Sequence, residues 1–467
     1  MTLQTAPGQP DLVITGATVL LHDENGDVQF VGDTTITITD GVFSAVESVH
    51  DAAVRGAGAR GADASAAVSR ARQTIDATGM IAMPGFINCH THSPMVMFRG
   101  AAEDVPESRW FNEFIWPMEV NLTDDDVEVA TRLAAAEMIR SGVTTFADHY
   151  FSMPAIAKVV DESGLRAVLG STYFSTDGQA GLEQSLAFAL EFAGASDGRI
   201  TTALAPHAPY TVTDADLAAT SAAALEHDLL VHIHASEDRH QMKHSRERFG
   251  HTPIETLRRA GLLENRLLLA HGIGIVPEDI PLLLGGGGSI GFGSAPRGYL
   301  KNGFDTTPVR LLDSFGIPVG LATDGAASNN TLDVWEAMTF LSLTQKAREN
   351  DQTYMTSRQA LGHATTKSAK AVQLGDSIGR IAPGYKADLI LVDLSDPRSQ
   401  PVHDYANTVV HGARSSDVDT TIVNGRVLMR GKKLLTIDVA GVIAELAPRL
   451  ERLTDRSHGT SIQNYDA

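Results

Sequence analysis

The sequence predicts an α/β protein, a distorted (β/α)8 TIM barrel with a small composite β-sandwich domain built from both ends of the chain. Eight apolar runs of strand length each end in polar or ionisable residues and are followed by helix-like stretches. Strand-like segments without a helical pattern occur near both ends. With 467 residues, 43% of them hydrophobic, the chain can bury one large core and one smaller one.

Near the N-terminus, DLVITGATVLL and TTITITDGVFSAVESV alternate in polarity and are interrupted by Gly and Asp, which indicates a small antiparallel β unit. The stretch from 51 to 72 is rich in Ala, Gly, Arg and Ser and has no large apolar side chains to bury. We expect it to be a mobile surface insertion. Near the other end, ADLILVDL and TTIVNGRVLMRGKKLLTI are strand-like, and Asn424-Gly425 predicts a hairpin turn.

These patterns divide the chain into two predicted domains. Residues 1–82 and 384–467 form the β-sandwich domain, with the insertion at 51–72 and a terminal helix, and residues 83–383 form the catalytic barrel.

The eight central runs carry the barrel prediction. In chain order they are IAMPGFINCHTH, VTTFADHY, LRAVLGSTYF, ITTALAPHAPY, LLVHIHASE, LLLAHGIG, SIGFGSAP and PVGLATDG. Continuous apolar strands are expected where both faces of a parallel sheet are buried. The segment Asp125 to Ser141 has helical spacing and stops at Gly142. Alternating strands and helices favour a parallel barrel, although strand counts alone also allow an open doubly wound sheet.

Composition excludes several classes of protein. Cys89 is the single cysteine, so an internal disulfide framework and a Cys-based zinc cluster are both excluded. A formal net charge of -20 argues against broad nucleic-acid binding and favours small neutral or cationic substrates. No long apolar segment or secretory leader is evident, so we expect a cytoplasmic protein that does not enter a membrane.

Most of the predicted strands end in a side chain that suits metal binding or proton transfer. These residues are His90, His92, His149, His207, His234, Glu237, His271 and Asp324. Barrel active sites lie at this edge. His90 and His92 are two residues apart, so on a strand both side chains point to one face, as two ligands of one ion require. A third imidazole, His234, and the carboxylate of Asp324 would complete a mixed N/O site suited to Zn²⁺ or Fe²⁺, with one position left for water.

Several segments resemble one known family. PGFINCHTHSPMVMFRGAAEDVP, APHAPYTVT, HASE, LLLAHG and TDGAASNNTLDVWEAM are similar to the metal-dependent aminohydrolases of the amidohydrolase superfamily. That subgroup contains guanine deaminase, the S-adenosylhomocysteine/methylthioadenosine deaminases and the triazine hydrolases. The similarity extends through essentially the whole chain to IAPGYKADLILVDL, which resembles the returning strands of the family's β-sandwich.

The resemblance implies a role for each strand-end group. His90, His92, His234 and Asp324 would bind one Zn²⁺ per chain, and Asp324 would also accept a proton from the nucleophilic water. Glu237 would protonate the ring nitrogen beside the attacked carbon, and His271 would polarise the water or the tetrahedral intermediate. No strand end carries the lysine that bridges two metals in binuclear relatives. We therefore expect a mononuclear site and, as in many relatives, a homo-oligomer (a dimer or tetramer).

The substrate-binding residues are predicted from the same resemblance. Glu119 matches a position that binds ribose hydroxyls, and His207 matches a residue that reaches the substrate from the fourth strand. Trp110 belongs to an aromatic cluster that could stack on a flat ring, and Arg297 lies in GSAPRGYLKNG, which replaces the family's usual H-N-P-x-S-N-x-K-L run. Ser171 stands where the S-adenosylhomocysteine-type relatives have an arginine for the substrate carboxylate, which makes homocysteine-bearing nucleosides less favoured.

The resulting prediction is hydrolytic deamination of an amino-substituted N-heteroaromatic ring, such as a purine, nucleoside, pterin or pyrimidine, with release of ammonia. A first alternative uses the same metal centre to displace chloride or an alkylamine from an s-triazine. Because chloride leaves without protonation, the presence of Glu237 favours amine release. A second alternative, an inactive barrel that only binds partners, is opposed by the complete ligand set.

Overall fold

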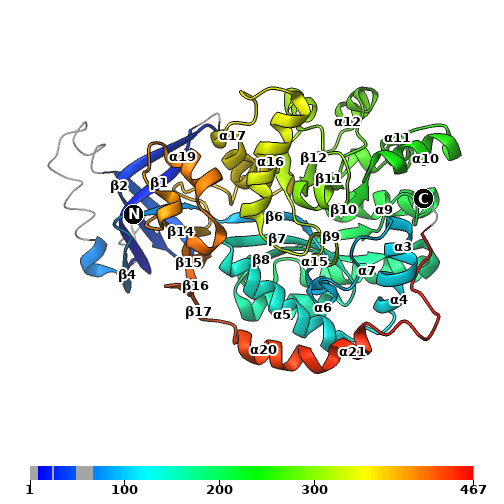
Figure 1. Cartoon of the computed structure of the whole chain (residues 1–467), viewed down its shortest axis with the longest axis horizontal. Coiled ribbons are helices and arrows are strands. Elements are labelled where there is room, and N and C mark those ends of the chain that lie inside the picture. The colour runs from blue at the N-terminus through cyan, green and yellow to red at the C-terminus, as the bar shows by residue number, and fades with distance from the viewer. Residues whose placement is uncertain (1–8, 24–25, 49–66, 466–467) are drawn as a thin grey trace, which may run out of the picture.

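A computed structural model describes residues 9–23, 26–48 and 67–465 of the chain. Figure 1 shows a β domain at one end, containing β1, β2, β4 and β14 to β17, beside a barrel that is surrounded by helices. The predicted α/β fold, a TIM barrel with a β domain built from both ends of the chain, is therefore confirmed. Residues 51–66 of the predicted insertion at 51–72 lie outside the described residues.

The barrel is an eight-stranded parallel sheet in which the strands neighbour each other in chain order. The strands are β6 (Phe86–Thr91), β7 (Val143–Tyr150), β8 (Arg166–Tyr173), β9 (Ile200–Pro206), β10 (Leu230–Ala235), β11 (Arg266–His271), β12 (Ile290–Ser294) and β13 (Val319–Leu321). Just beyond β13, the backbone N–H groups of Thr323 and Asp324 donate to the His90 carbonyl at 3.3 and 3.0 Å. Because the last strand thereby meets the first, the sheet closes, and the open-sheet alternative is excluded.

The first apolar run does not form one strand. It is divided at Gly85 into β5 (Met80–Pro84), which belongs to the β domain, and β6, which opens the barrel. Glycine is required here because a Cβ atom on Gly85 would lie only 2.1 Å from Cγ2 of Thr144. The Gly85 N–H also donates to the Asp388 carbonyl at 3.1 Å, which fixes the junction to the returning chain.

Both ends of the chain contribute strands to one mixed nine-stranded sheet. Its strands are β1 (Leu12–His22), β2 (Val28–Thr39), β3 (Val42–Ser48), β4 (Gln73–Asp76), β5, β14 (Leu389–Asp393), β15 (Val418–Val423), β16 (Arg426–Arg430) and β17 (Lys433–Leu434). β5 joins the halves, pairing parallel to β1 and antiparallel to β14. The predicted Asn-Gly hairpin links β15 to β16, with φ of 51° at Asn424 and 76° at Gly425, as a type I′ turn requires.

The longer helices that pack around the barrel follow the strands. They are α5 (Asp124–Arg140), α6 (Met153–Ser163), α7 (Gln179–Phe192), α9 (Asp214–His227), α10 (Arg239–Phe249), α11 (Pro253–Arg259) and α16 (Val334–Glu349). α5 matches the helix predicted over 125–141, begins with a Thr123–Asp126 capping box and stops before Gly142 at φ 84°. None of the helices in the described ranges is both long and apolar enough to span a bilayer.

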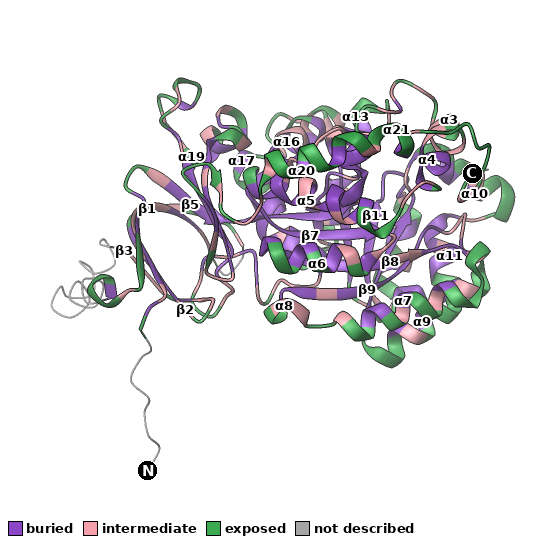
Figure 2. Ribbon diagram, turned by 90° about the horizontal axis from the view of Figure 1, so that it is seen from below, coloured by how far each residue is buried: buried purple, intermediate pink, exposed green. Residues whose placement is uncertain are grey.

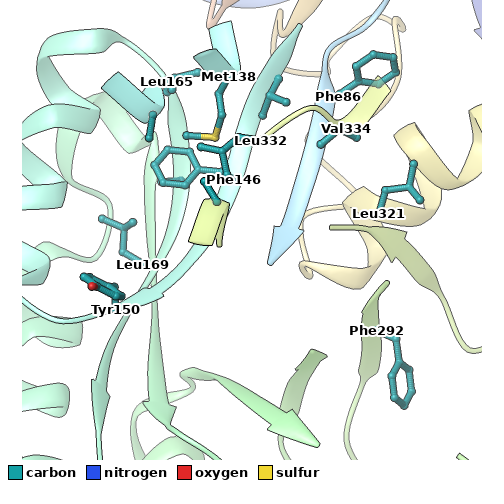
Figure 3. Close-up of a cluster of buried hydrophobic side chains, with 14 of the residues drawn as sticks. Phe86, Met138, Phe146, Tyr150, Leu165, Leu169, Phe292, Leu321, Leu332 and Val334 are labelled. Atoms are coloured by element: carbon teal, nitrogen blue, oxygen red, sulfur yellow. The ribbon is translucent and has the colours of Figure 1, made fainter. Parts of the chain in front are cut away.

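The hydrophobic core lies between the barrel strands and these helices, where Figure 2 shows the strands almost wholly buried. Figure 3 shows members of this cluster, including Met138 of α5, Phe146 of β7 and Phe86 of β6. Phe86 meets Trp335 of α16 edge to face, with ring centroids 5.3 Å apart. Burying each such large side chain stabilises the fold by about 1.5–3 kcal/mol, so the strand ends rest on a rigid frame.

Candidate metal centre

Four of the predicted ligands meet at the C-terminal end of the barrel strands. His90 and His92 come from the end of β6 and His234 from β10, while Asp324 follows β13. The Nε2 atoms of His92 and His234 are 3.3 Å apart. Oδ1 of Asp324 lies 3.3 Å from Nε2 of His92 and 3.6 Å from Nε2 of His90. The fold thus brings together side chains that are more than two hundred residues apart in the sequence.

Each of the three imidazoles is oriented through its other ring nitrogen. Nδ1 of His92 lies 2.5 Å from the His149 carbonyl, and Nδ1 of His234 lies 2.8 Å from the His207 carbonyl. Nδ1 of His90 lies 2.9 Å from Nε2 of His232. An Nδ1–H that donates to a carbonyl fixes the tautomer and leaves the Nε2 lone pair free for a metal. The lone pairs of His92 and His234 therefore point into the same space.

The residues fit a tetrahedrally coordinated metal ion. Ligands with bonds of about 2.0–2.2 Å to one tetrahedral ion are separated by about 3.3–3.6 Å, and the three distances given above fall in this range. His90 Nε2 is buried and has no hydrogen-bond partner among the described residues. Facing lone pairs repel each other unless a cation lies between them. The donor set, imidazole and carboxylate without thiolate, suits Zn²⁺ or Fe²⁺.

The protonation states are compatible with ligation. Burial lowers the pKa of His90 to about 3 and that of His234 well below its usual value, so both rings are neutral at pH 7. Burial opposes ionisation of Asp324, but the close approach of the His90 and His92 rings to its carboxylate more than compensates and holds its pKa well below the usual range. Asp324 is therefore an anionic candidate ligand beside the neutral rings of His90 and His234.

Two groups of the centre occupy unusual backbone conformations. His271 has φ 79° and Asp324 has φ 61°, in the left-handed region that non-glycine residues rarely adopt. Asp324 is held there by Gly325 N–H, which donates to its Oδ1 at 2.8 Å, and by the Ser328 hydroxyl, which donates to its Oδ2 at 2.7 Å. Such strain is retained where the surrounding structure enforces it, and it occurs most often at functional sites.

His271 and Glu237, which were predicted to act beside the metal, lie at the same mouth. A ring nitrogen of His271 lies within 4.8 Å of ring nitrogens of His90 and His234. Burial lowers the pKa of His271 to about 4. Burial, reinforced by the charge of Glu107, raises the pKa of Glu237 to about 8. At neutral pH His271 is therefore an uncharged imidazole and Glu237 a carboxylic acid with a proton to give.

A cavity of about 540 Å³ opens above these groups. His92, His234, Glu237, His271 and Asp324 form part of its wall. The predicted substrate-binding residues Glu119, His207 and Trp110 also line it. Glu119 is buried and accepts a hydrogen bond of 2.7 Å from the Tyr150 hydroxyl. The volume and the aromatic lining suit a flat heterocycle with one substituent.

One predicted substrate-binding residue lies elsewhere. Arg297, in α13 (Pro296–Lys301), does not line the cavity, because its guanidinium pairs with Glu336 at 2.8 Å. The same helix contributes Tyr299 and Lys301 to the wall instead. Ser171, which was considered as the counterpart of a carboxylate-binding arginine, is not a lining residue either.

Sequence reasoning missed several residues that support the site. His232 orients His90, and the H-I-H spacing of β10, which repeats the H-T-H of β6, was a signal that could have revealed it. His149, one of the strand-end residues that the sequence did indicate, lines the cavity, and its Nδ1 lies 2.7 Å from the Thr172 hydroxyl. Glu107 also lines the cavity, although no sequence pattern marked it.

Comparisons with known proteins agree with this geometry. The model of the amidohydrolase family matches residues 81–428. A 5-methylthioadenosine/S-adenosylhomocysteine deaminase from Pelotomaculum thermopropionicum is 41% identical over 389 residues, which cover 83% of this chain and 89% of the relative. A second protein of that name, from Desulforudis audaxviator, is 40% identical over 82% of this chain and 90% of its own length.

A solved structure supports the same conclusion. The structure of a zinc-bound adenosine deaminase from Xanthomonas campestris matches with a TM-score of 0.86 and 30% identity, covering 96% of this chain and 99% of that one. With the family model matching most of the length and relatives of 40% identity or more, the chain belongs to the amidohydrolase family.

Proposed function

We propose that this protein is a mononuclear, zinc-dependent aminohydrolase that releases ammonia from an amino-substituted purine nucleoside. The observation that carries the proposal is that an imidazole–carboxylate cluster and a protonated carboxyl group meet at one cavity. The cluster consists of His90, His92, His234 and Asp324, and the carboxyl group is that of Glu237. Hydrolytic deamination needs both, because water must be activated and a ring nitrogen must be protonated.

The residues of the chain divide the proton transfers between them. Bound zinc would supply hydroxide at neutral pH by lowering the pKa of a coordinated water to about 7. Asp324 is an anion at the edge of the cluster and would accept a proton from the nucleophilic water. Glu237 is a neutral acid in the cavity wall and donates its proton to the ring nitrogen beside the attacked carbon. Protonation makes the neighbouring ring carbon electrophilic. The proton held by Asp324 would then pass to the amino group, which leaves as ammonia.

His271 would stabilise the oxygen that develops negative charge. Its Nδ1 lies 3.3 Å from the Tyr299 hydroxyl. When Nδ1 accepts a hydrogen bond from this hydroxyl, Nε2 of the neutral ring carries the ring proton and can donate a hydrogen bond. One such donor contributes about 3 kcal/mol to transition-state stabilisation.

The substrate class follows from the relatives and from the cavity. The curated relatives are named as deaminases of 5-methylthioadenosine and S-adenosylhomocysteine, and the similar solved structure is named as an adenosine deaminase. Among the described residues that line the cavity, Lys301 is the single Lys or Arg, and it pairs with Glu103 at 2.7 Å. A free carboxylate on the substrate would therefore lack a partner, which favours adenosine and its methylthio derivative over S-adenosylhomocysteine.

The experiment that tests the proposal is ammonia release by zinc-loaded protein across a panel of substrates. The panel contains adenosine, 5′-methylthioadenosine, S-adenosylhomocysteine, guanine, a pterin, cytosine and an amino- and chloro-substituted s-triazine. We expect ammonia release from adenosine and from 5′-methylthioadenosine, with a kcat/KM that is higher for one of these two nucleosides than for any other compound of the panel. Release of chloride or alkylamine from the triazine, with no ammonia from any nucleoside, would replace this proposal with triazine hydrolysis.

A further inference from the structure

The C-terminal segment of the chain reaches the mouth of the cavity. After α20 (Val439–Leu446) and α21 (Leu450–Leu453), it runs toward α3 (Glu107–Arg109) and α4 (Trp116–Glu119), as Figure 1 shows. The backbone N–H of Ile462 donates to the Trp116 carbonyl at 3.3 Å. The segment is therefore hydrogen-bonded to the loop that follows the first barrel strand.

Tyr465 is fixed near the end of this segment. Its backbone N–H donates to the side chain of Asn112 at 2.8 Å, and its carbonyl accepts from the same side chain at 2.9 Å. The Tyr465 ring stacks on Phe111 with centroids 4.9 Å apart and meets the ring of Tyr210 at 5.5 Å. These contacts aim the hydroxyl of Tyr465 at Glu107, where it donates to Oε2 at 3.0 Å.

Glu107 lines the cavity, and its carboxyl group has no cationic partner among the described residues. Among the described residues, no Lys, Arg or His forms an ion pair with Glu107, and the hydrogen bond from Tyr465 engages only Oε2. Burial and the nearby charge of Asp238 raise the pKa of Glu107 to about 7, which means that the surroundings do not compensate its negative charge. The second oxygen, Oε1, is therefore free to accept a hydrogen bond from a bound molecule.

The rest of the cavity lining also provides little positive charge to compensate Glu107. The other acidic lining residues are Asp104, Glu119, Glu237 and Asp324, of which Glu237 is protonated at neutral pH and Asp324 belongs to the metal cluster. Lys301, the single Lys or Arg among the described lining residues, is already paired with Glu103. A cationic group would compensate a charge that the protein leaves uncompensated, whereas a carboxylate would meet like charge in a partly desolvated space.

We propose that Glu107, positioned by Tyr465, is a specificity-determining residue that favours substrates with a positive charge or an N–H donor at the mouth of the cavity and disfavours those with a carboxylate. The inference rests on the proposed deamination of nucleosides and narrows its substrate class. Tyr465 is a positioning residue in this scheme because it does not line the cavity itself.

The test uses three 5′-thioadenosines whose 5′ substituents end in a methyl, an aminoethyl or a carboxymethyl group. Ammonia release by zinc-loaded protein is measured at a pH of about 7.5, where most of Glu107 is ionised. We expect kcat/KM to fall in the order amine, methyl, carboxylate. In Glu107→Gln, the ratio of kcat/KM for the amine to that for the carboxylate should fall at least tenfold, mainly through KM. Any effect on the chemical step itself cancels in this ratio.

Two further variants separate positioning from folding. Tyr465→Phe keeps the ring packing but removes the hydroxyl, so the ratio should fall several-fold while the melting temperature stays near that of the wild type. Glu113→Gln is the matched control, because Glu113 lies in the same loop, is exposed and pairs with Arg109 at 2.7 Å. This control should leave the ratio unchanged.

The outcomes distinguish the inference from the proposed function. If Glu107→Gln and Tyr465→Phe deaminate the methyl compound and retain the wild-type ratio, Glu107 does not select substrates and the inference is wrong. If wild-type protein releases no ammonia from any of the three nucleosides, the proposed function fails. Binding of the amine and carboxylate compounds, measured by calorimetry, then still tests the charge preference of Glu107, which is refuted if both bind equally.

Discussion

The acid group of Glu237 lies between the Tyr210 hydroxyl, 3.4 Å from its Oε2, and the side-chain amide of Gln241, 3.1 Å from its Oε1. Glutamine at position 237 would keep the shape and these contacts but would have no proton to transfer. Glu237→Gln should therefore lower kcat by about 10²–10⁴-fold and leave the zinc content unchanged. Steady-state kinetics and metal analysis check this, and near-normal turnover would remove Glu237 from the mechanism.

The same carboxyl group predicts a pH dependence. Glu237 must be protonated to act as an acid, and burial together with Glu107 raises its pKa to about 8. Activity should therefore be retained below this value and fall as the pH rises through about 8. Replacing Glu107 by Gln removes a negative neighbour, which lowers the pKa of Glu237 and moves the descending limb to lower pH. The measurement is a pH profile of kcat/KM on an uncharged nucleoside, and an unmoved limb would contradict this coupling.

His232 provides a residue-level test of how the ligands are oriented. It is fully buried, and its Nε2 lies 2.9 Å from Nδ1 of His90. Loss of a partner that orients a metal ligand typically weakens metal binding by about 10–100-fold. We expect His232→Leu to raise the zinc dissociation constant by this factor in competition with a chelator. His227→Gln, an exposed change at the end of α9, should have no effect and is the control.

At the level of elements, one buried ion pair joins the barrel to the β domain. Nε of Arg166, in β8, donates to Asp388 Oδ2 at 2.7 Å, and both side chains are about 95% buried or more. The Asn424 N–H in the β15–β16 hairpin also donates to Asp388, at 2.7 Å. Because Asp388→Ala would leave a buried guanidinium unpaired, it should destabilise the protein by about 3–5 kcal/mol.

Urea denaturation checks this prediction. Asp388→Asn keeps a hydrogen-bond acceptor but not the charge. Its free energy of unfolding should therefore lie between those of Asp388→Ala and the wild type. Asp376→Ala, at an exposed position, should change the free energy of unfolding by less than about 0.5 kcal/mol. If Asp388→Ala and Asp376→Ala lowered the free energy of unfolding by similar amounts, the ion pair would not be what stabilises the junction.

The elements also show which features the sequence could predict. Apolar period and strand-end polarity depend on local residues, so the eight runs, the hairpin at Asn424 and helix α5 were predictable. The break at Gly85 was not, because an apolar run looks the same whether it enters one sheet or two. Arg297 was placed in the cavity incorrectly, since its direction is set by Glu336, which is distant in the sequence.

The residues of the candidate site also divide into those that the sequence could predict and those that it could not. The clustering of His90, His92, His234 and Asp324 could be predicted because each lies at the end of a periodic apolar strand. Glu107 and Tyr465 could not, because their contact joins positions 358 residues apart, and neither lies in a periodic element. Contacts that depend on loop paths and on the chain terminus leave no local pattern in the sequence.

At the level of the whole molecule, the candidate metal centre depends on closure of the barrel, because its proposed ligands come from the first, fifth and last strands. A bound ion would therefore connect opposite sides of the sheet and stabilise the folded state over the unfolded state, in which the ligands are far apart. A ligand present at about a thousand times its dissociation constant stabilises a protein by about 4 kcal/mol. Removal of zinc should thus lower the melting temperature by several degrees and abolish turnover together.

This prediction also tests the number of metal ions. The described residues contain three overlapping groups of possible ligands, and each group includes two of His90, His92 and His234. The Nδ1 contacts of these three rings leave only the inward-facing Nε2 lone pairs for ligation. Titrating zinc into chelated protein should therefore restore both activity and the melting temperature with a common end point near one equivalent per chain. If activity needs a second equivalent after the melting temperature has recovered, the mononuclear assignment is wrong, because two ions would then be required for the chemistry. If fully chelated protein remains active, the proton transfers assigned to Asp324 and Glu237 need a different source of nucleophile.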